Sequence, residues 1–405
     1  MFVVCNNYHV RLPQFHCGLF DTRRPVLFSP FSFLQYFRTV PCGHATIFSG
    51  GVMRLFWSQK SRLLAILIIS LTFFALTGCA GTPQDILRAY SPAAAEIANL
   101  FNILFWVSVA VFVLVEGLLV FFVLRYQRRA QDEHPEQYHG NTRLEVTWTL
   151  VPALILAVVF ALTIQTMGQV GPTNPPAQGI PITVAGQRWW WSIEYPEAKV
   201  RTAGILHMPT GQVMNVALHS ENVIHSFWVP SLMGKTDVMP GHDNSTWIYG
   251  NIPGTYSGQC TEYCGTQHAN MLFRVKVQSP EEFQAWLQSQ TAPAVEPAPG
   301  SLEATGKEIF LNPNNKCIGC HSIESTDAPL QDGPNLAHFA SRECFAGCIY
   351  ENNRDNLTRW LENPEAMKPG NLMAKALMTL RPETPYHPLT ADQVAALTAY
   401  LESLK

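Results

Sequence analysis

Two long apolar runs constrain the fold of this 405-residue chain more than any other feature of its sequence. From Ile97 to Leu124 the only charged residue is Glu116, and from Val146 to Gly168 there is none. A helix needs about 20 apolar residues to cross the hydrocarbon core of a bilayer, so each run can span a membrane. The second run contains Pro152, which membrane helices tolerate. The sequence therefore predicts a transmembrane helical hairpin within residues 79–168.

The loop between the two apolar runs is rich in positive charge, with Arg125, Arg128, Arg129 and Arg143. The positive-inside rule places such a loop in the cytoplasm, so everything after residue 168 lies on the outer or periplasmic side. The composition agrees with a membrane location, since 47% of the residues are hydrophobic and only 14% are charged. A net charge of −3 offers no basic surface. We therefore expect membrane lipid as a partner and no nucleic acid.

The N-terminal region has the features of a targeting signal. Within residues 53–78, basic residues precede an apolar run from Leu63 to Leu76, as in secretory signal peptides. The ending Leu-Thr-Gly-Cys79 resembles a bacterial lipobox, in which the cysteine is lipidated, and it predicts a protein of the bacterial cell (inner) membrane. A retained third transmembrane helix is the alternative, although roughly 14 apolar residues are short for a span. Residues 1–52 show no periodicity, and we expect a non-native or removed extension.

A loop with the sequence Cys260-Thr-Glu-Tyr-Cys264-Gly-Thr-Gln-His268-Ala-Asn-Met271 concentrates side chains that bind metals. It offers two thiols, an imidazole and a thioether, and His225 adds a second imidazole from a distant strand end. Soft sulfur and imidazole ligands together favour copper or zinc over magnesium or calcium. The loop therefore predicts a copper or zinc site.

The number of donors separates the two metals. A single blue copper needs one Cys, two His and a weak Met, so it does not account for a second cysteine. If Cys260 and Cys264 bridge two copper ions, each sulfur fills a position on both metals. His225 and His268 then supply one ligand each, and Met271 with one backbone carbonyl completes four ligands per copper. A structural zinc with two Cys and two His is the alternative, and it leaves the methionine without a role.

The loop resembles the binuclear copper A site of cytochrome c oxidase subunit II. The segments His225-Ser-Phe-Trp-Val-Pro-Ser-Leu and Lys235-Thr-Asp-Val-Met-Pro-Gly are similar to the strand and loop that precede the site in that family. The resemblance implies that Glu262 lends its backbone carbonyl to copper. It also implies that the Glu262 side chain points toward a magnesium ion shared with subunit I, with Asp237 nearby.

Two further segments carry the same resemblance. Trp189-Trp-Trp-Ser-Ile-Glu-Tyr is similar to the aromatic patch where electrons enter, which implies that role for Trp189. Strand packing is the alternative for at least one of the three tryptophans, because neighbours in a strand point to opposite faces. Glu145 lies in a segment similar to the start of the family's second helix, where a Glu marks the mouth of a proton pathway in subunit I. A helix N-terminal acid favoured by the dipole is a compatible interpretation.

A second redox motif, Cys317-Ile-Gly-Cys320-His321, matches the attachment sequence of c-type haem. By itself the pattern also fits a thiol redox pair. It stands, however, in a segment of residues 301–405, which is long enough for one small domain. That segment ends in an amphipathic helix with a capping box formed by Thr390 and Gln393. We therefore expect a C-terminal all-α cytochrome c domain with covalent haem c.

The sixth haem ligand should be a thioether, since Met/His ligation raises the reduction potential of an electron carrier. Met367, Met373 and Met378 compete for this position. The segment Lys368-Pro-Gly-Asn-Leu-Met373 resembles the axial-Met loop of cytochromes c fused to oxidase subunit II, which favours Met373. In the same domain, Cys344 and Cys348 are predicted to form a disulfide in an oxidising compartment.

Between the hairpin and the haem segment, residues 179–278 contain short β-patterned runs bounded by Gly or Pro, as in an all-β sandwich or barrel. The runs are Ile180–Tyr195, Val213–His219, Ser226–Pro230, Thr246–Asn251 and Met271–Val277. The arrangement resembles the cupredoxin fold. A short helix over Glu281–Gln290 and an Ala/Pro-rich linker over 291–300 are predicted to follow.

Together these features predict a membrane-anchored multidomain chain, with a transmembrane hairpin, a cupredoxin-like copper domain and a cytochrome c domain. The resemblance implies the subunit at which electrons enter a terminal respiratory oxidase. Electrons would pass from an external donor, a cytochrome c or cytochrome bc complex, to haem c, to copper A and to haem a. That last haem lies in subunit I, where oxygen is reduced to water with proton translocation. Subunit III is a further expected partner.

Two other functions stay open at this point. The small subunit of a copper A-containing nitric oxide reductase can look alike, and the sequence of the adjacent large subunit would separate the two. A copper-binding lipoprotein that acts as a metallochaperone is a hypothesis from another functional class. The haem motif and the two apolar runs argue against it, because a metallochaperone has no use for a haem.

Overall fold

The computed structural model describes residues 69–70, 84–126, 137, 140–171, 178–315, 317–374 and 389–405. The chain divides into two units, Met1–Thr82 and Pro83–Lys405, and apart from residues 69–70 all described residues belong to the second. The predicted extension at 1–52, nearly all of the predicted signal and Cys79 lie outside the described residues. Met378 also lies outside them.

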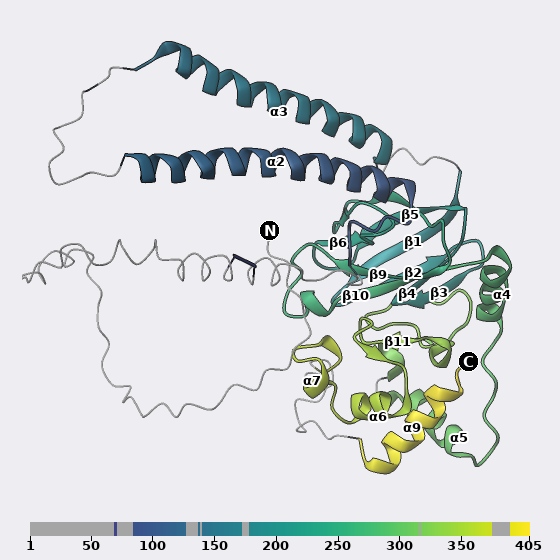
Figure 1. Ribbon diagram of the computed structural model, residues 1–405. Coiled ribbons are helices and arrows are strands. Elements are labelled where there is room, and N and C mark those ends of the chain that lie inside the picture. The colour runs from purple at the N-terminus through teal and green to yellow at the C-terminus, as the bar shows by residue number, and fades with distance from the viewer. Residues whose placement is uncertain are drawn as a thin grey trace, which may run out of the picture. The chain divides into compact units, whose positions relative to one another are not determined.

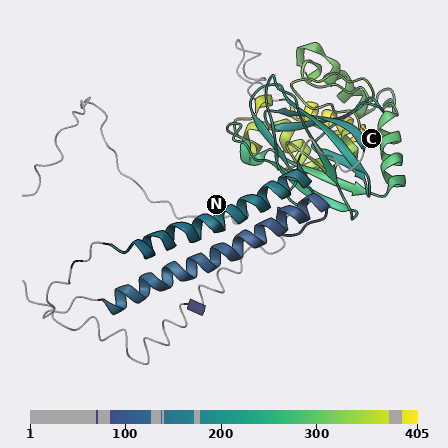
Figure 2. The ribbon, with the colours of Figure 1, turned by 90° about the horizontal axis from the view of Figure 1, so that it is seen from above.

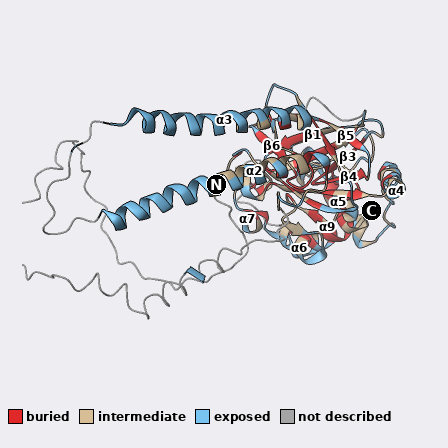
Figure 3. Cartoon of the chain, turned by 45° about the horizontal axis from the view of Figure 1, so that its top comes forward, coloured by how far each residue is buried: buried red, intermediate tan, exposed pale blue. Residues whose placement is uncertain are grey.

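Two long helices, α2 (Pro92–Arg125) and α3 (Thr142–Val170), run side by side and include both predicted spans (Figures 1 and 2). Both are long and apolar enough to cross a membrane. Most of their side chains are exposed, as the pale blue of Figure 3 shows. An apolar helix whose side chains find no protein core requires an apolar surrounding instead, which a bilayer supplies.

Short contacts tie the hairpin to the β domain. Ser91 caps α2 by accepting a hydrogen bond from the Ala94 backbone N–H, and its hydroxyl donates to the carbonyl of Leu232 at 2.6 Å. At the end of α3, the indole of Trp247 donates to the carbonyl of Gly171 at 3.0 Å. These bonds satisfy polar groups at the ends of both helices.

The β domain is a sandwich of two five-stranded sheets, with strand orders β3-β2-β1-β5-β8 and β4-β10-β9-β6-β7. Strands β1 and β5 pair in parallel, as do β4 and β10, whereas the other neighbours within the two sheets are antiparallel. The strands are β1 Ile180–Gln187, β2 Trp190–Tyr195, β3 Val200–Ala203, β4 Ile205–Pro209, β5 Val213–Ser220, β6 His225–Trp228, β7 Thr236–Val238, β8 Asn244–Tyr249, β9 Gly254–Cys260 and β10 Leu272–Gln278.

Aromatic and aliphatic side chains from both sheets fill the sandwich. Trp191, Phe227 and Phe273 form a cluster of fully buried rings with centroids 4.5 to 5.5 Å apart. Helix α4 (Pro280–Thr291) begins with a capping box and places Phe283 in the same core. The predicted all-β sandwich is therefore confirmed.

The structure differs from the predicted strand list in two respects. The run Ile180–Tyr195 forms two strands, β1 and β2, because the chain turns at 188–189. Strands β3, β4, β7 and β9 were not predicted. Glycine weakens a strand pattern, but Gly258 is needed in β9 because a Cβ there would lie 2.2 Å from the Phe273 ring.

The C-terminal domain is mainly helical, with α5 (Leu302–Leu311) and α9 (Ala391–Ser403) packed across each other. Gly306 allows this close crossing, since a Cβ there would lie 2.0 Å from the Ala396 carbonyl oxygen. The predicted capping box of α9 is present. The remaining elements are η3 Pro313–Asn315, η4 Cys317–Gly319, η5 Phe339–Ser341, β11 Cys344–Phe345, β12 Tyr350–Glu351, α6 Arg354–Glu362 and α7 Pro364–Met367.

Candidate metal and haem sites

The structure brings together the sulfur and imidazole side chains that the sequence predicted as copper ligands. His225 begins β6 and Cys260 ends β9, and these strands are neighbours in one sheet. The Cys260 sulfur lies 3.9 Å from His225 Nδ1 and 3.8 Å from the Cys264 sulfur. All three side chains are buried, and their ligand atoms lie within 4.8 Å of one another. Their metal-binding atoms therefore face a common point.

The rest of the predicted ligand set surrounds the same two sulfurs. The Cys264 sulfur lies 3.6 Å from His268 Nδ1 and 3.8 Å from the Met271 sulfur. The backbone oxygen of Glu262 lies 3.3 Å from the Cys260 sulfur. Each cysteine thus has one imidazole and one further weak donor beside it. Two bridged copper ions use this six-donor set fully, whereas a zinc site needs only four donors.

Surrounding residues orient His225. Its Nε2 lies 3.2 Å from the side-chain oxygen of Asn222, which can only accept, so Nε2 carries the proton and Nδ1 presents its lone pair to the sulfurs. Gly186 makes room for the ring, because a Cβ there would lie 2.7 Å from Cδ2 of His225. Trp191 packs edge-on against the imidazole at 5.9 Å. Asn222 is a supporting residue that no sequence motif indicated.

The two thiols affect each other's protonation. The hydrogen bond between the two side chains lowers the pKa of Cys260 and raises the pKa of Cys264. One thiolate forms readily, but a second would repel it at this distance. Metal cations between the sulfurs would offset that repulsion, and only thiolates bind them strongly. The donor chemistry therefore fits copper A.

The three consecutive tryptophans have different environments. Trp189 is only 7% exposed, and its indole N–H donates to the backbone carbonyl of Cys264 at 2.9 Å. Trp190 is half-buried and donates to the carbonyl of Asp332 in the haem domain at 3.3 Å. Trp191 is fully buried between the sheets. Of the three indole N–H groups, only that of Trp189 is bonded to the copper-ligand loop 260–271.

The side chains of Glu262 and Asp237 are both exposed. Both line a cavity of about 550 Å³ together with Asp243 and Lys235. Carboxylate oxygens are the donors that magnesium prefers. Glu145, far away in the first turn of α3, accepts a hydrogen bond of 3.2 Å from the backbone N–H of Asn141, the N-cap residue. It therefore stabilises the start of the helix.

The haem motif begins in η4, which follows α5 and η3. Cys317 and Cys320 are half-buried, and His321 Nδ1 lies 2.8 Å from the carbonyl oxygen of Pro334. A carbonyl only accepts, so Nδ1 carries the proton and Nε2 keeps its lone pair for a metal. Burial lowers the pKa of His321 and so favours the neutral imidazole that iron requires. The histidine thus fits the proximal position of haem c.

Two other residues of this domain bear on haem binding. Met373 is half-buried in a helical turn at 372–374, and Met367 ends α7. Arg342 was not predicted: it donates to the carbonyls of Asn335 and Ala337, and its buried Nε has no hydrogen-bond partner among the described residues. A buried cation with an unpaired N–H suits an anionic group such as a haem carboxylate. A single arginine offers no spacing that a sequence motif could reveal.

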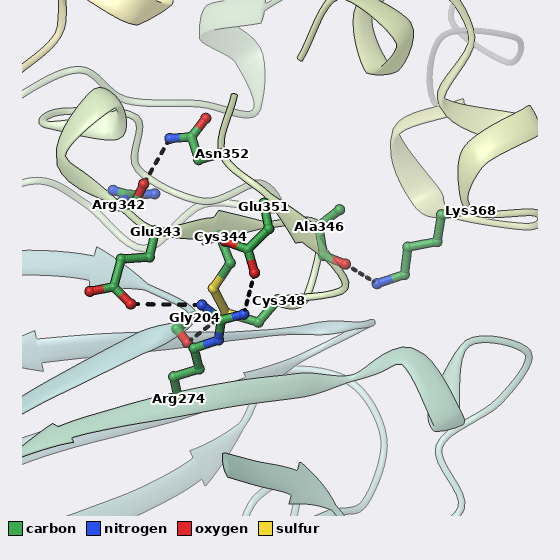
Figure 4. Close-up of a disulfide and its surroundings, with 10 residues drawn as sticks. All are labelled: Gly204, Arg274, Arg342, Glu343, Cys344, Ala346, Cys348, Glu351, Asn352 and Lys368. Carbon is green, nitrogen blue, oxygen red and sulfur yellow. Dashed lines mark hydrogen bonds and ion pairs between the residues drawn. A yellow bond between two sulfur atoms is a disulfide. The ribbon is translucent and has the colours of Figure 1, made fainter. Parts of the chain in front are cut away.

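The predicted disulfide between Cys344 and Cys348 is present and closes a turn between β11 and β12 (Figure 4). This turn and the nearby Lys368 contact the β domain. Burial lowers the pKa of Lys368 to about 7. The protonated amine nevertheless matches its surroundings, because three carbonyl oxygens accept from it and a neutral amine has only two N–H groups.

Comparison with known proteins assigns all three parts of the chain. The family described as cytochrome c oxidase subunit II, transmembrane domain, matches residues 82–165, and its periplasmic domain matches residues 200–278. The cytochrome c family matches residues 303–405. Copper A and haem c are the cofactors that these families imply. The two apolar helices, one of them wholly within the matched transmembrane region and the other mostly so, anchor the chain in a membrane.

Two relatives match this chain over nearly their whole length. Cytochrome c oxidase subunit 2 of Alkalihalophilus pseudofirmus is 33% identical over 357 residues, which cover 86% of this chain and 98% of the relative. That of Bacillus subtilis is 31% identical over 362 residues, covering 84% and 97%. A solved structure, the periplasmic domain of subunit II of cytochrome oxidase of Bradyrhizobium japonicum, is 28% identical with a TM-score of 0.27, covering 28% of this chain and 94% of that one.

The predicted membership is therefore confirmed by two independent features. The matched families follow one another in the order hairpin, β domain and haem domain, as the structure does. The identity extends over almost the whole length of the relatives. The chain belongs to the cytochrome c oxidase subunit II family, in the form that carries a C-terminal cytochrome c domain, and is a subunit of that oxidase.

Proposed function

We propose that this chain conducts electrons from an external donor, through bound haem c and copper A, to haem a of subunit I. One observation carries the proposal: the six-donor cluster and the haem domain lie in one chain, and Trp189 is bonded to both. When bound, haem c and copper A each take up and release one electron at a time. Oxygen reduction and proton translocation belong to subunit I, and subunit III is a further proposed partner.

The residues of this chain hold and shape the two centres. Cys260 and Cys264 supply thiolates, while His225 and His268 present neutral nitrogens. Met271 and the carbonyl of Glu262 are weak donors in line with a copper site tuned for electron transfer. In the haem domain, Cys317 and Cys320 would hold haem c covalently, and His321 and Met373 would bind its iron.

Other roles follow from position. The side chains of Glu262 and Asp237 are proposed to hold magnesium where subunit I would face the cavity. Glu145 is proposed to lie at the mouth of a proton pathway, in addition to its contact with the N-cap. The positive charges between α2 and α3 support the proposal that this end of the hairpin is cytoplasmic, that the chain crosses the membrane twice and that the copper and haem domains lie outside. Cys79 remains the proposed lipidation site.

The proposal is tested on the purified oxidase. After the copper held by subunit I itself is subtracted, metal analysis should find two copper ions per chain. The electron resonance spectrum should show seven hyperfine lines, because bridging thiolates would share one unpaired electron between two metals. The absorption spectrum should show one covalent haem c. Four hyperfine lines, or one zinc per chain, would reject the binuclear assignment. The spectrum of the associated large subunit separates an oxygen-reducing complex from a nitric oxide reductase.

A further inference from the structure

Lys368 is a buried cation at the junction between the haem and copper domains. It is only 4% exposed and directly precedes the Pro369-Gly-Asn-Leu-Met373 segment. Its ammonium group donates to the carbonyls of Trp189 at 3.2 Å, Asn270 at 3.1 Å and Ala346 at 2.8 Å (the last in Figure 4). One side chain thus joins the tryptophan turn, the copper-ligand loop and the disulfide-closed turn.

The surroundings of Lys368 are unusual for a lysine. Among the described residues, no carboxylate forms an ion pair with it. Burying an unpaired ammonium costs free energy, and hydrogen bonds to all three of its N–H groups offset that cost only when their geometry is kept. Small displacements of the three carbonyls would leave the charge unsatisfied. The lysine therefore favours one relative arrangement of the segments over others.

The disulfide-closed turn fits tightly against the same junction. The carbonyl of Gly347 accepts a hydrogen bond of 3.1 Å from the backbone N–H of Leu272 in β10. Gly347 has a φ of +82°, and a Cβ there would lie 2.5 Å from the Asn270 oxygen and 2.9 Å from Lys368 Nζ. Cys348 places its sulfur 3.1 Å from the carbonyl oxygen of Gly204 (Figure 4). No larger residue fits where the turn meets Lys368.

The segment that leads to Met373 lies on the copper-ligand loop as well. The side-chain amide of Gln267 donates to the carbonyl of Pro369 at 2.5 Å. Gly370 approaches Thr266 so closely that a Cβ would lie 3.2 Å from its methyl group. Residues 266–270 and 368–370 therefore touch directly, and each segment leads within a few residues to a proposed metal ligand, Met271 or Met373.

We propose that Lys368 is a positioning residue that locks the Met373 segment of the haem domain onto the copper-ligand loop and so fixes the haem-to-copper geometry. This inference rests on the proposed electron path. The partner of the lysine is the chain itself: three backbone carbonyls that become neighbours only when the two domains dock in one register. In the docked arrangement Trp189 is buried and its carbonyl accepts from Lys368 of the haem domain, so an external donor delivers electrons to the haem domain.

Ion pairs at the edge of the junction provide a matched contrast. Lys199 and Asp327 lie 3.2 Å apart but are each 64% exposed. Lys276 and Glu343 lie 2.6 Å apart with side chains more than one third exposed. Such exposed pairs contribute little because water and salt screen them. The buried lysine should therefore determine how the two domains dock more strongly than these ion pairs do. Lys276→Met is a suitable control for Lys368→Met.

The test uses the complete purified oxidase with either substitution. Hydrogen–deuterium exchange of peptides covering 264–274 and 342–350 reports docking without any electron transfer, and flash-induced reduction of haem c reports the haem-to-copper rate. We expect Lys368→Met to speed exchange in both peptides by at least about tenfold and to slow the transfer by a similar factor. Haem absorption and the copper resonance spectrum should remain as in the wild type. Lys276→Met should change each rate less than about threefold.

The outcomes separate the two proposals. If the wild type transfers no electron from haem to copper, the proposed function fails, while the exchange rates still decide whether Lys368 locks the domains. If the wild type transfers but Lys368→Met matches it in both measurements, the positioning role is overturned. Should Lys368→Met fail to assemble, Gly347→Ala opens the same junction from the opposite side, and unchanged exchange and transfer in that variant would equally overturn it.

Discussion

The indole N–H of Trp189 donates a 2.9 Å hydrogen bond to the backbone carbonyl of Cys264. The bond joins the turn between β1 and β2 to the copper-ligand loop, and the ring packs against Gly265, where a Cβ would lie 3.0 Å from Cζ2. The carbonyl of the same tryptophan accepts from Lys368 of the haem domain. Trp189 therefore provides a continuous bonded path between the two domains.

Trp189→Phe should slow the oxidation of haem c because it removes this hydrogen bond while keeping an aromatic ring in place. We expect a loss of at least about tenfold in the haem-to-copper rate, equivalent to about 1.4 kcal/mol in the barrier. Flash photolysis that follows the haem and copper absorptions separately measures it. Trp190→Phe is the control, since its indole bonds to Asp332 and not to the copper loop. If the haem-to-copper rate falls equally in both variants, the hydrogen bond of Trp189 has no special role in the transfer.

Met271→Leu should change the copper potential and leave the copper content at two ions per chain. The thioether is a weak donor, and the two thiolates and two imidazoles hold the metals without it. Losing a donor disfavours the oxidised state, so the potential should rise, on the order of 60 mV for a tenfold change in a one-electron equilibrium. Redox titration of the resonance spectrum measures this shift. A variant with one copper per chain would show that Met271 is required for binding.

The candidate copper site could be predicted because most of its donors are close in sequence. Cys260, Cys264, His268 and Met271 lie on one loop, so their spacing alone suggests a common metal. The sixth donor is the carbonyl of Glu262 on that same loop. Only His225 is distant in sequence, and it is indicated both by the need for a second imidazole and by the resemblance of its segment to a known family. The long apolar runs predicted the two helices for a similar reason, since the pattern is local.

The junction around Lys368 could not be predicted in the same way. The three acceptors of its ammonium group are backbone carbonyls, which every residue possesses, so no side-chain pattern marks Asn270 or Ala346 as partners. Strand β9 was missed because Gly258 weakens a strand pattern, whereas in the folded sheet the glycine makes room for Phe273. In both cases the residue is explained by a contact with a segment that is distant in the sequence.

Acid should destabilise the β domain through His207. Its ring stacks on Trp286 at 3.9 Å and bonds to Gln278, and burial lowers its pKa to about 4. The unfolded histidine, with a pKa of about 6.5, binds a proton more readily. Stability from this residue is therefore complete above pH 6.5 and is lost as the pH falls toward 4. The loss should be at most about 3 kcal/mol.

Urea unfolding of a fragment spanning residues 178–291 at several pH values measures that loss. His207→Phe keeps the stack on Trp286 but cannot titrate, so its unfolding free energy should vary less between pH 6.5 and 4 than that of the wild type. Comparing the two at equal copper loading removes the contribution of the copper ligands, which also take up protons. Parallel pH profiles would show that His207 does not cause the acid sensitivity.

Replacing both Cys344 and Cys348 by serine should destabilise the haem domain. Closing so short a loop is worth about 2 kcal/mol by the chain-entropy relation. The turn also holds Gly347 against Leu272, so the double variant should speed hydrogen exchange in β10. Thermal unfolding followed by haem absorption measures the first effect. Alkylation of both cysteines in the wild type without reductant, seen by mass spectrometry, would contradict the disulfide itself.

Transfer from haem to copper within this chain should be independent of protein concentration and nearly independent of salt. A separate cytochrome must find its oxidase by diffusion, and the charges that steer it are screened by salt. Here the domains are joined through 291–300 and docked through Lys368, whose bonds to carbonyls are buried. Raising the salt to about 1 M, where the Debye length falls to about 3 Å, should therefore leave the flash-induced rate unchanged.

The arrival of electrons from an external donor at the haem domain should slow in the same experiment and serves as its control. A haem-to-copper rate that scales with protein concentration would mean that the fused domain does not supply its own copper centre.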